Sequence, residues 1–142
     1  QMVILNPTEL LIFENFRSAS GSPVPAARFG GAATTITNLS YGELTDSGTL
    51  MLCDTGSDQI LSFDTWQFDQ TNIAPTRFIS GNNTSLSEPR QFARVGKTLY
   101  LADGGNVLVF EDIDTLEGNN FPSRKFSGLN PNTQTLQGLI FP

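Results

Sequence analysis

The feature that most constrains this chain is a short motif that occurs three times. Each copy places a phenylalanine before an acidic residue, with another apolar residue three positions after that phenylalanine. The copies are ELLIFENF (9–16), QILSFDTW (59–66) and NVLVFEDI (106–113). An internal repeat at this spacing predicts that one supersecondary unit is built three times and stacked.

The same local signals surround each copy. An apolar segment precedes it and ends in Asn6, Asp54 or Asp103, side chains that accept hydrogen bonds from the backbone of their own turn. A polar loop follows, then a proline-led segment that closes on glycine: PAARFGG (25–31), PTRFISG (75–81) and PSRKFSG (122–128). A less regular fourth element begins at Leu39, Pro89 and Leu136. We therefore expect four short strands in each repeat, with the repeats at about 1–48, 49–97 and 98–142.

The repeats indicate an all-β fold. Their apolar segments are short and bounded by Gly, Pro, Asn and Ser clusters. No long stretch keeps the spacing of three and four residues that an amphipathic helix needs, and Pro or Gly interrupts most windows that come close. The prediction is a set of antiparallel sheets of four strands each.

The two ends of the chain complement each other in this pattern. Phe13, Phe63 and Phe110 stand 50 and 47 residues apart, and the interval is 45 when it is counted from Phe110 through the C-terminus and on from the N-terminus. The segment LQGLIFP (136–142) resembles a first strand without followers, and QMVIL (1–5) a second strand without a predecessor. Because unpaired strand edges invite pairing, we expect the two segments to complete each other's sheet.

Composition excludes several classes of function. The 142 residues suffice for one domain with a packed core. A net charge of −6 disfavours nucleic acid as a partner. No apolar run has the length of a spanning helix, and no secretion signal is visible, so we expect a soluble chain with no membrane partner, in a compartment that the sequence does not indicate.

Two residue counts restrict the chemistry. Histidine is absent, which removes Ser-His-Asp and Cys-His catalysis and histidine-based zinc sites within one chain. The single cysteine, Cys53, lies in the apolar segment LMLCD, and we interpret it as a core residue rather than a reactive thiol. We predict no catalytic residues and no metal ligands.

Strand–turn–strand units such as LYLADGGNVLVF, followed by a loop and an R-x-F-S-G-like segment, resemble the blades of NHL-type and related six-bladed β-propellers. The resemblance covers essentially the whole chain, although its motifs are turn and core residues. The first repeat departs from it by having NPT in place of an Asp-Gly turn. The resemblance implies three four-stranded blades in this chain.

Three blades are too few to close a ring, because propellers usually have about four to eight. We therefore predict a head-to-tail homodimer with six blades, in which residues 136–142 of one copy supply the innermost strand of the first blade of the other. The alternative is that these residues belong to a longer single-chain propeller.

The resemblance also selects candidate binding residues. Propeller ligands usually meet the turns between second and third strands, the loops that lead into the innermost strands, and the central channel. The candidates in these places are Glu43, Asp54, Arg90, Gln91, Arg94, Asp103 and Gln137. Alternation along PRQFARV places Arg90, Phe92 and Arg94 on one face of the strand and Gln91 on the other, and it leaves open which face lines the channel.

Several acidic residues have simpler explanations. Asp54 and Asp103 are more easily explained as turn caps than as ligands. Glu14, Asp64 and Glu111 are expected to be solvated or to pair with the arginines of the proline-led strands, Arg28, Arg77 and Arg124. The acidic loop at 111–120 has oxygen ligands that suit calcium but lacks the spacing of an EF-hand, so we expect it to be solvated.

Two functions remain. The favoured one is a non-catalytic binding or scaffold module that presents loops and a channel to a protein or small-molecule ligand, without a cofactor. The alternative is a calcium-dependent hydrolase or lactonase of the six-bladed kind, which requires Glu43 to converge with Asp54 or Asp103.

Overall fold

The structure is a computed structural model that describes residues 1–128, 136 and 139–140. Its strands form three antiparallel sheets, which confirms the all-β prediction. The first sheet contains β1 (Met2–Asn6), β2 (Glu9–Phe13) and β3 (Ala27–Gly30). The second contains β4 (Leu39–Leu44), β5 (Leu50–Asp54), β6 (Gln59–Phe63) and β7 (Arg77–Ile79). The third contains β8 (Pro89–Val95), β9 (Thr98–Asp103), β10 (Asn106–Phe110) and β11 (Arg124–Phe126).

In each sheet, strands that are neighbours in sequence are also neighbours in space. The strand β4 pairs with β5, so the repeats counted from residues 1, 49 and 98 are offset from the sheets by one strand. Among the described strands, β1 pairs only with β2, and the first sheet therefore has three strands. The segment 136–142, expected to provide a further strand, lies largely outside the described residues.

The repeated motif has the same structure in all three sheets. Phe13, Phe63 and Phe110 each end a strand and pair with the first or second residue of the preceding strand. Two positions later the backbone enters the left-handed region, with φ values of 52° at Asn15, 55° at Thr65 and 53° at Asp112. The repeat found in the sequence is thus a repeat of backbone geometry.

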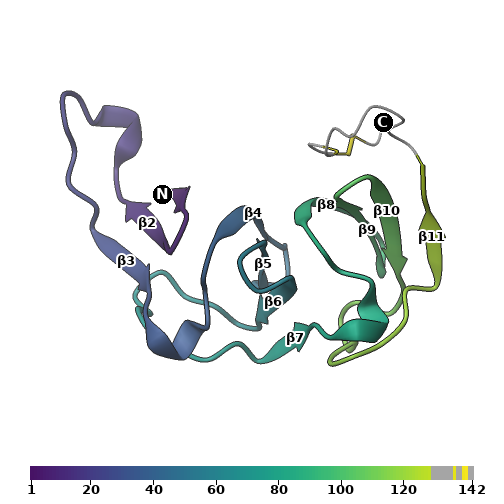
Figure 1. The fold of residues 1–142 in the computed structure, drawn as a ribbon. Helices are drawn as coiled ribbons and strands as arrows, with labels where there is room; N and C mark the ends of the chain where they lie inside the picture. Colours follow the sequence, from purple (N-terminus) through teal and green to yellow (C-terminus); the bar gives the residue numbers. More distant parts are fainter. Residues whose placement is uncertain (129–135, 137–138, 141–142) are drawn as a thin grey trace.

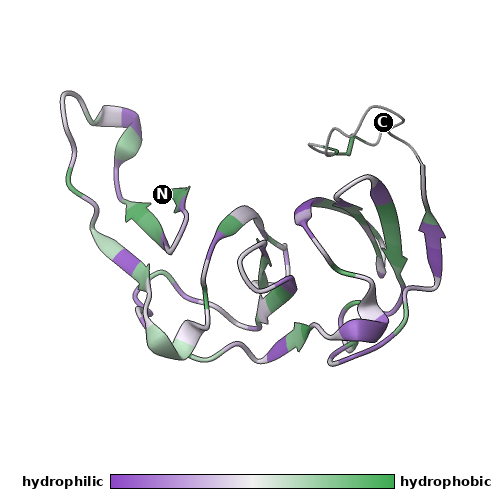
Figure 2. Cartoon of the chain, in the orientation of Figure 1, coloured by the Kyte–Doolittle hydropathy of each residue, from purple (hydrophilic) through white to green (hydrophobic). Residues whose placement is uncertain are grey.

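The sheets stand side by side along an arc, with β3, β7 and β11 on its outer side (Figure 1). One core lies between the first and second sheets, around Phe29, Leu52 and Phe63, and another lies between the second and third, around Met51, Phe92 and Phe110. The middle strands β5 and β6 are buried along their whole length because both faces of the second sheet are covered. Figure 2 shows the hydrophobic residues gathered on the central strands, whereas β11 is largely hydrophilic.

The expectation that Cys53 is a core residue is confirmed. Cys53 has no exposed surface, and its burial raises the pKa of the thiol. Trp66 is buried in the first core, with Phe68 packed against it, and Leu116 packs against the second core.

The connections between sheets share one design. The three-residue 3₁₀ helices η2 (Ala32–Thr34) and η3 (Asn82–Thr84) follow Gly31 and Gly81, whose φ values are +117° and +107°. Asn72 accepts a hydrogen bond of 2.9 Å from the Ala33 N–H, and Asn119 accepts one of 2.7 Å from the Asn83 N–H. Each asparagine belongs to the sheet that the connection enters, so it ties neighbouring sheets together. A third such helix, η1 (Phe16–Ser18), follows β2.

Candidate functional site

Asp54 holds the loop that enters its own sheet. Its carboxylate is completely buried and accepts hydrogen bonds from the backbone N–H groups of Thr37 (2.8 Å) and Asn38 (2.7 Å) and from the Thr37 hydroxyl (2.8 Å). Gly56 N–H and the Gln59 amide donate two further bonds, of 3.1 and 3.3 Å. Burial alone would raise the pKa of Asp54, but the bonds from Asn38 and Thr37 outweigh it and the pKa lies below its ordinary value.

Asp103 has the same role in the third sheet. It is fully buried and accepts hydrogen bonds from the Ser87 N–H (3.0 Å), the Ser87 hydroxyl (2.9 Å) and the Glu88 N–H (2.9 Å). Ser87 and Glu88 precede β8 as Thr37 and Asn38 precede β4. Asp54 therefore caps the start of β4 and Asp103 the start of β8, and their oxygens are occupied by protein donors.

Arg90 and Asp58 lie at the same end of the sheets as these caps. Arg90 forms an ion pair with Glu88. Asp58, in the turn after β5, has a buried carboxylate oxygen without a hydrogen-bond partner among the described residues. Burial raises the pKa of Asp58, and the neighbouring charges of Asp103, Glu88 and Asp54 raise it further.

Glu43 and Arg94 both lie at the opposite end of the sheets. They line a cleft of about 650 Å³ between the second and third sheets, together with the turn that joins β4 to β5. Arg94 donates a hydrogen bond of 2.8 Å to Asp114 and lies against the Met51 sulfur at 3.9 Å. The structure thus divides the predicted site residues between two ends of the sheets.

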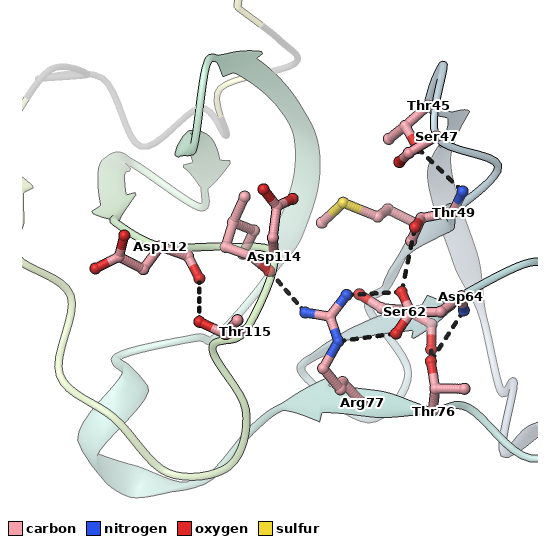
Figure 3. A network of polar contacts seen from close by, with 12 residues as sticks. Thr45, Ser47, Thr49, Ser62, Asp64, Thr76, Arg77, Asp112, Asp114 and Thr115 are labelled. Carbon is pink, nitrogen blue, oxygen red and sulfur yellow. Dashed lines mark hydrogen bonds and ion pairs between the residues drawn. The ribbon is translucent and has the colours of Figure 1, made fainter.

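A second arginine fixes one wall of this cleft. Arg77 binds both oxygens of Asp64 at 2.8 and 3.1 Å and donates to the Ile113 carbonyl at 2.7 Å (Figure 3). These bonds from Arg77 lower the pKa of Asp64. Because Ile113 belongs to the third sheet's loop, this network also joins two sheets. The sequence suggested the Asp64–Arg77 pair but not the cleft beside it.

Glu14 is solvated rather than paired, which is one of the two outcomes expected for these acidic residues. Arg28 pairs with Glu9 at 2.6 Å, while Glu14 is exposed. The reason is register: Ala27, not Arg28, lies opposite Ile12, in the position that Arg77 occupies opposite Ser62 and Arg124 opposite Val109. Arg124 does lie near Glu111, at 4.0 Å.

The two faces of β8 are distinguished by their contacts. Phe92 packs in the core between the second and third sheets, and Arg94 reaches Met51 of the second sheet. Gln91 lies on the other face, where its side-chain oxygen accepts a hydrogen bond of 3.3 Å from the Leu139 N–H. A bulge between Pro89 and Gln91 interrupts the alternation at Arg90. Gln137 lies outside the described residues.

The geometry separates the carboxylates that calcium chemistry would need. On the β4–β5 ladder, Leu39 lies opposite Asp54 and Glu43 opposite Met51. Three residue steps along β5 therefore separate Glu43 from Asp54, which is roughly 10 Å. Within the described ranges, no group of three or more Asp, Glu or Cys side chains is arranged to hold a metal ion. Asp114 of the acidic loop is bound to Arg94 instead.

No helix in the part of the chain that the structure describes has the length and apolar character needed to cross a bilayer. In comparisons with known proteins, no family model matches the chain and no curated protein matches it significantly.

Proposed function

We propose that this chain is a non-catalytic binding module in which the three sheets serve as blades of a β-propeller of the NHL-like, six-bladed kind. The observation that carries the proposal is that the carboxylates of Asp54 and Asp103 accept hydrogen bonds from backbone N–H groups just before β4 and β8. Carboxylates used in this way position loops. The geometry therefore supports a scaffold that presents surfaces better than it supports an enzyme.

The cleft between the second and third sheets is the surface we propose for ligand contact. Its volume of about 650 Å³ lies within the range of small-molecule sites. Arg77 and Arg94 are already held by Asp64 and Asp114, so the walls are preorganised. Asp46, by contrast, is exposed on the turn between β4 and β5 at the rim of the cleft.

The test maps binding on the isotope-labelled chain by amide NMR. The probes are a mixture of small carboxylates, amines and monosaccharides. We expect shifts at cleft amides such as Thr45 and Gly96, and weaker shifts in Asp46→Ala. Asp69→Ala, which changes another exposed acid away from the cleft, is the control. Shifts confined to other surfaces, or none at all, would refute the cleft as the ligand surface.

The calcium-dependent hydrolase is tested separately. If Glu43 and a capping aspartate held calcium, millimolar calcium chloride would raise the melting temperature, and Glu43→Gln would abolish that rise. The binding-module proposal expects no rise and no hydrolysis of simple esters or lactones. A calcium-dependent rise that Glu43→Gln removes would favour the enzyme.

A further inference from the structure

We infer that a second copy of this chain docks head to tail on this one. The face of the third sheet that is directed away from the second sheet in one copy packs against the face of the first sheet that is directed away from the second sheet in the other. This inference rests on the propeller arrangement proposed above. It is argued from the two sheet interfaces inside the chain, which act as templates for a third.

In each internal interface, one side chain of an outer strand packs against two side chains of the next sheet. Between the first and second sheets these are Phe29, Phe63 and Trp66, all buried, with ring centroids 5.0 Å apart for Phe29–Phe63 and 5.5 Å for Phe29–Trp66. Between the second and third sheets the equivalent residues are Ile79, Phe110 and Ile113, which share one buried cluster. The interface therefore repeats as a unit of three apolar side chains.

The same unit occurs a third time, divided between the two ends of the chain. By strand register, Phe126 of β11 stands where Phe29 and Ile79 stand, because it lies opposite Val107 as they lie opposite Leu10 and Ile60.

Phe13 and Phe16 stand where Phe63 and Trp66 stand in the second sheet. The left-handed Asn15 matches Thr65, so the chain leaves both strands in the same direction.

In one copy this third unit is incomplete. Phe126 is 46% exposed and Phe16 is 38% exposed, whereas their equivalents Phe29 and Trp66 are 0% and 5% exposed. Single exposed apolar side chains are common, so the two rings point to a contact surface because their equivalents in the internal interfaces are buried. Phe126 of one copy packed against Phe13 and Phe16 of another would bury both exposed rings.

Backbone hydrogen bonds place Leu136 next to the third sheet in the same way as they place the start of β4 next to the first sheet. The Leu39 N–H, at the start of β4, donates to the Pro7 carbonyl in the β1–β2 turn at 2.7 Å. The Leu136 N–H donates to Gly104, the equivalent carbonyl in the β9–β10 turn, also at 2.7 Å. Leu136 therefore stands beside the third sheet as Leu39 stands beside the first, where the following sheet begins.

The first sheet lacks what this arrangement would supply. Strand β1 has one edge without a partner among the described strands, and unpaired edges favour the addition of a strand. Asn6 is the equivalent of Asp54 and Asp103, and it is exposed. Asp54 and Asp103 accept hydrogen bonds from the backbone of the loop that leads into the following strand. A second copy that presents Leu136 beside β1 would give Asn6 the donors that its equivalents have.

In a pair of copies, the exposed face of each first sheet packs against the exposed face of the other copy's third sheet, so all four faces are covered. The contact is heterologous, and such contacts either close into a ring or extend into a filament. With three sheets in each copy, two copies give six, which lies within the usual range of propeller rings. The structure thus points to a closed pair with two identical new interfaces.

The experiment measures the mass of the full chain by light scattering and sedimentation over a range of concentrations. The expected mass is twice 15.4 kDa. Phe126→Lys and Phe16→Glu should each give the monomer mass with unchanged far-ultraviolet circular dichroism. Phe78→Lys is the matched control: Phe78 is 48% exposed and belongs to β7, the outer strand of the middle sheet. It should leave the mass doubled.

Mixing the two variants tests the head-to-tail geometry. A mixed pair contains one unaltered interface and one altered interface. In the altered interface the lysine introduced by Phe126→Lys in one copy faces the glutamate introduced by Phe16→Glu in the other, so that opposite charges meet. The mixture should therefore recover the doubled mass that each variant alone has lost.

A chain that stays at 15.4 kDa at every concentration would overturn the inference, as would a doubled mass in Phe126→Lys alone. An equal loss of mass in Phe78→Lys would also overturn it, since that position lies away from both end faces. None of these residues lines the cleft between the second and third sheets, so failure here is distinguishable from failure of ligand binding.

Discussion

At the scale of single residues, a buried carboxylate at the end of a strand fixes the loop that enters the same sheet. Asp54 and Asp103 each receive two successive backbone N–H groups and a hydroxyl from that loop. The sequence identified both residues as turn caps because an Asx side chain follows an apolar strand. It did not reveal the donors in the preceding loop, which lie 15 to 17 positions earlier in the chain.

Replacing Asp54 by alanine should lower the free energy of unfolding by about 3 kcal/mol, because buried backbone donors lose their acceptor. The measurement is urea denaturation followed by tryptophan fluorescence. Asp46→Ala, which removes an exposed acid from the β4–β5 turn, should change stability by less than about 0.5 kcal/mol. Equal effects of the two substitutions would contradict the capping role.

The carboxylates also predict how stability depends on pH. The pKa of Asp64 is lowered by its hydrogen bonds to Arg77, and that of Asp54 is lowered by its backbone donors despite burial. At these two carboxylates the folded chain therefore binds protons less tightly than the unfolded chain. This stabilisation is present above the ordinary aspartate pKa of about 4 and is lost as the pH falls below it.

We expect the urea midpoint to fall between pH 5 and pH 3, within the range of about pH 5 to pH 1 where lowered carboxyl pKa values act. The fall should be smaller in Asp64→Asn, which cannot titrate at this position. Parallel curves for the two proteins would show that the Asp64–Arg77 pair does not contribute.

At the scale of elements, the hairpins were predictable and the connections were not. Alternation and an Asx residue before each turn identified the strand pairs around Phe13, Phe63 and Phe110. Arg28 differs from Arg77 and Arg124 in register, because the first sheet places Ala27 at the position that those two arginines occupy. Register is decided by pairing across the sheet, which a single strand's sequence does not contain.

Asn72 and Asn119 are predicted to stabilise the connections between sheets. Each accepts a backbone N–H that follows a left-handed glycine, and a Cβ on Gly31 or Gly81 would approach the asparagine to 2.9 or 2.7 Å. Alanine at either asparagine should cost about 1 kcal/mol of stability, and the two losses should add because the sites share no partner.

Chemical denaturation of the single and double variants measures this sum. Asn82→Ala, a change in the same η3 loop at an exposed residue, should be close to neutral. A double variant no less stable than either single variant would show that the two connections do not act independently.

At the scale of the whole molecule, the sequence predicted three antiparallel sheets because its repeat is regular. The surfaces between sheets could not be predicted in the same way, since they depend on which face of each strand meets its neighbour. The cleft beside Glu43 and Arg94 is an example: its walls come from both sheets and from the loop at Asp114.

Association of two copies should make thermal stability depend on concentration. A partner that binds only the folded state stabilises it by mass action, so a hundredfold increase in chain concentration should raise the melting temperature of the native chain. Differential scanning calorimetry measures the change, and Phe126→Lys should melt at one temperature throughout. A melting temperature that is independent of concentration in both proteins would argue against a folded pair.

The single cysteine lies where it reports on the centre of the molecule. Cys53 is on β5, in the sheet whose two faces are both covered, and its burial disfavours the thiolate that reacts with alkylating reagents. Labelling of this thiol must therefore wait for the middle sheet to open. The rate at which the native protein reacts with such a reagent therefore measures the rate of that opening, and no added probe is needed.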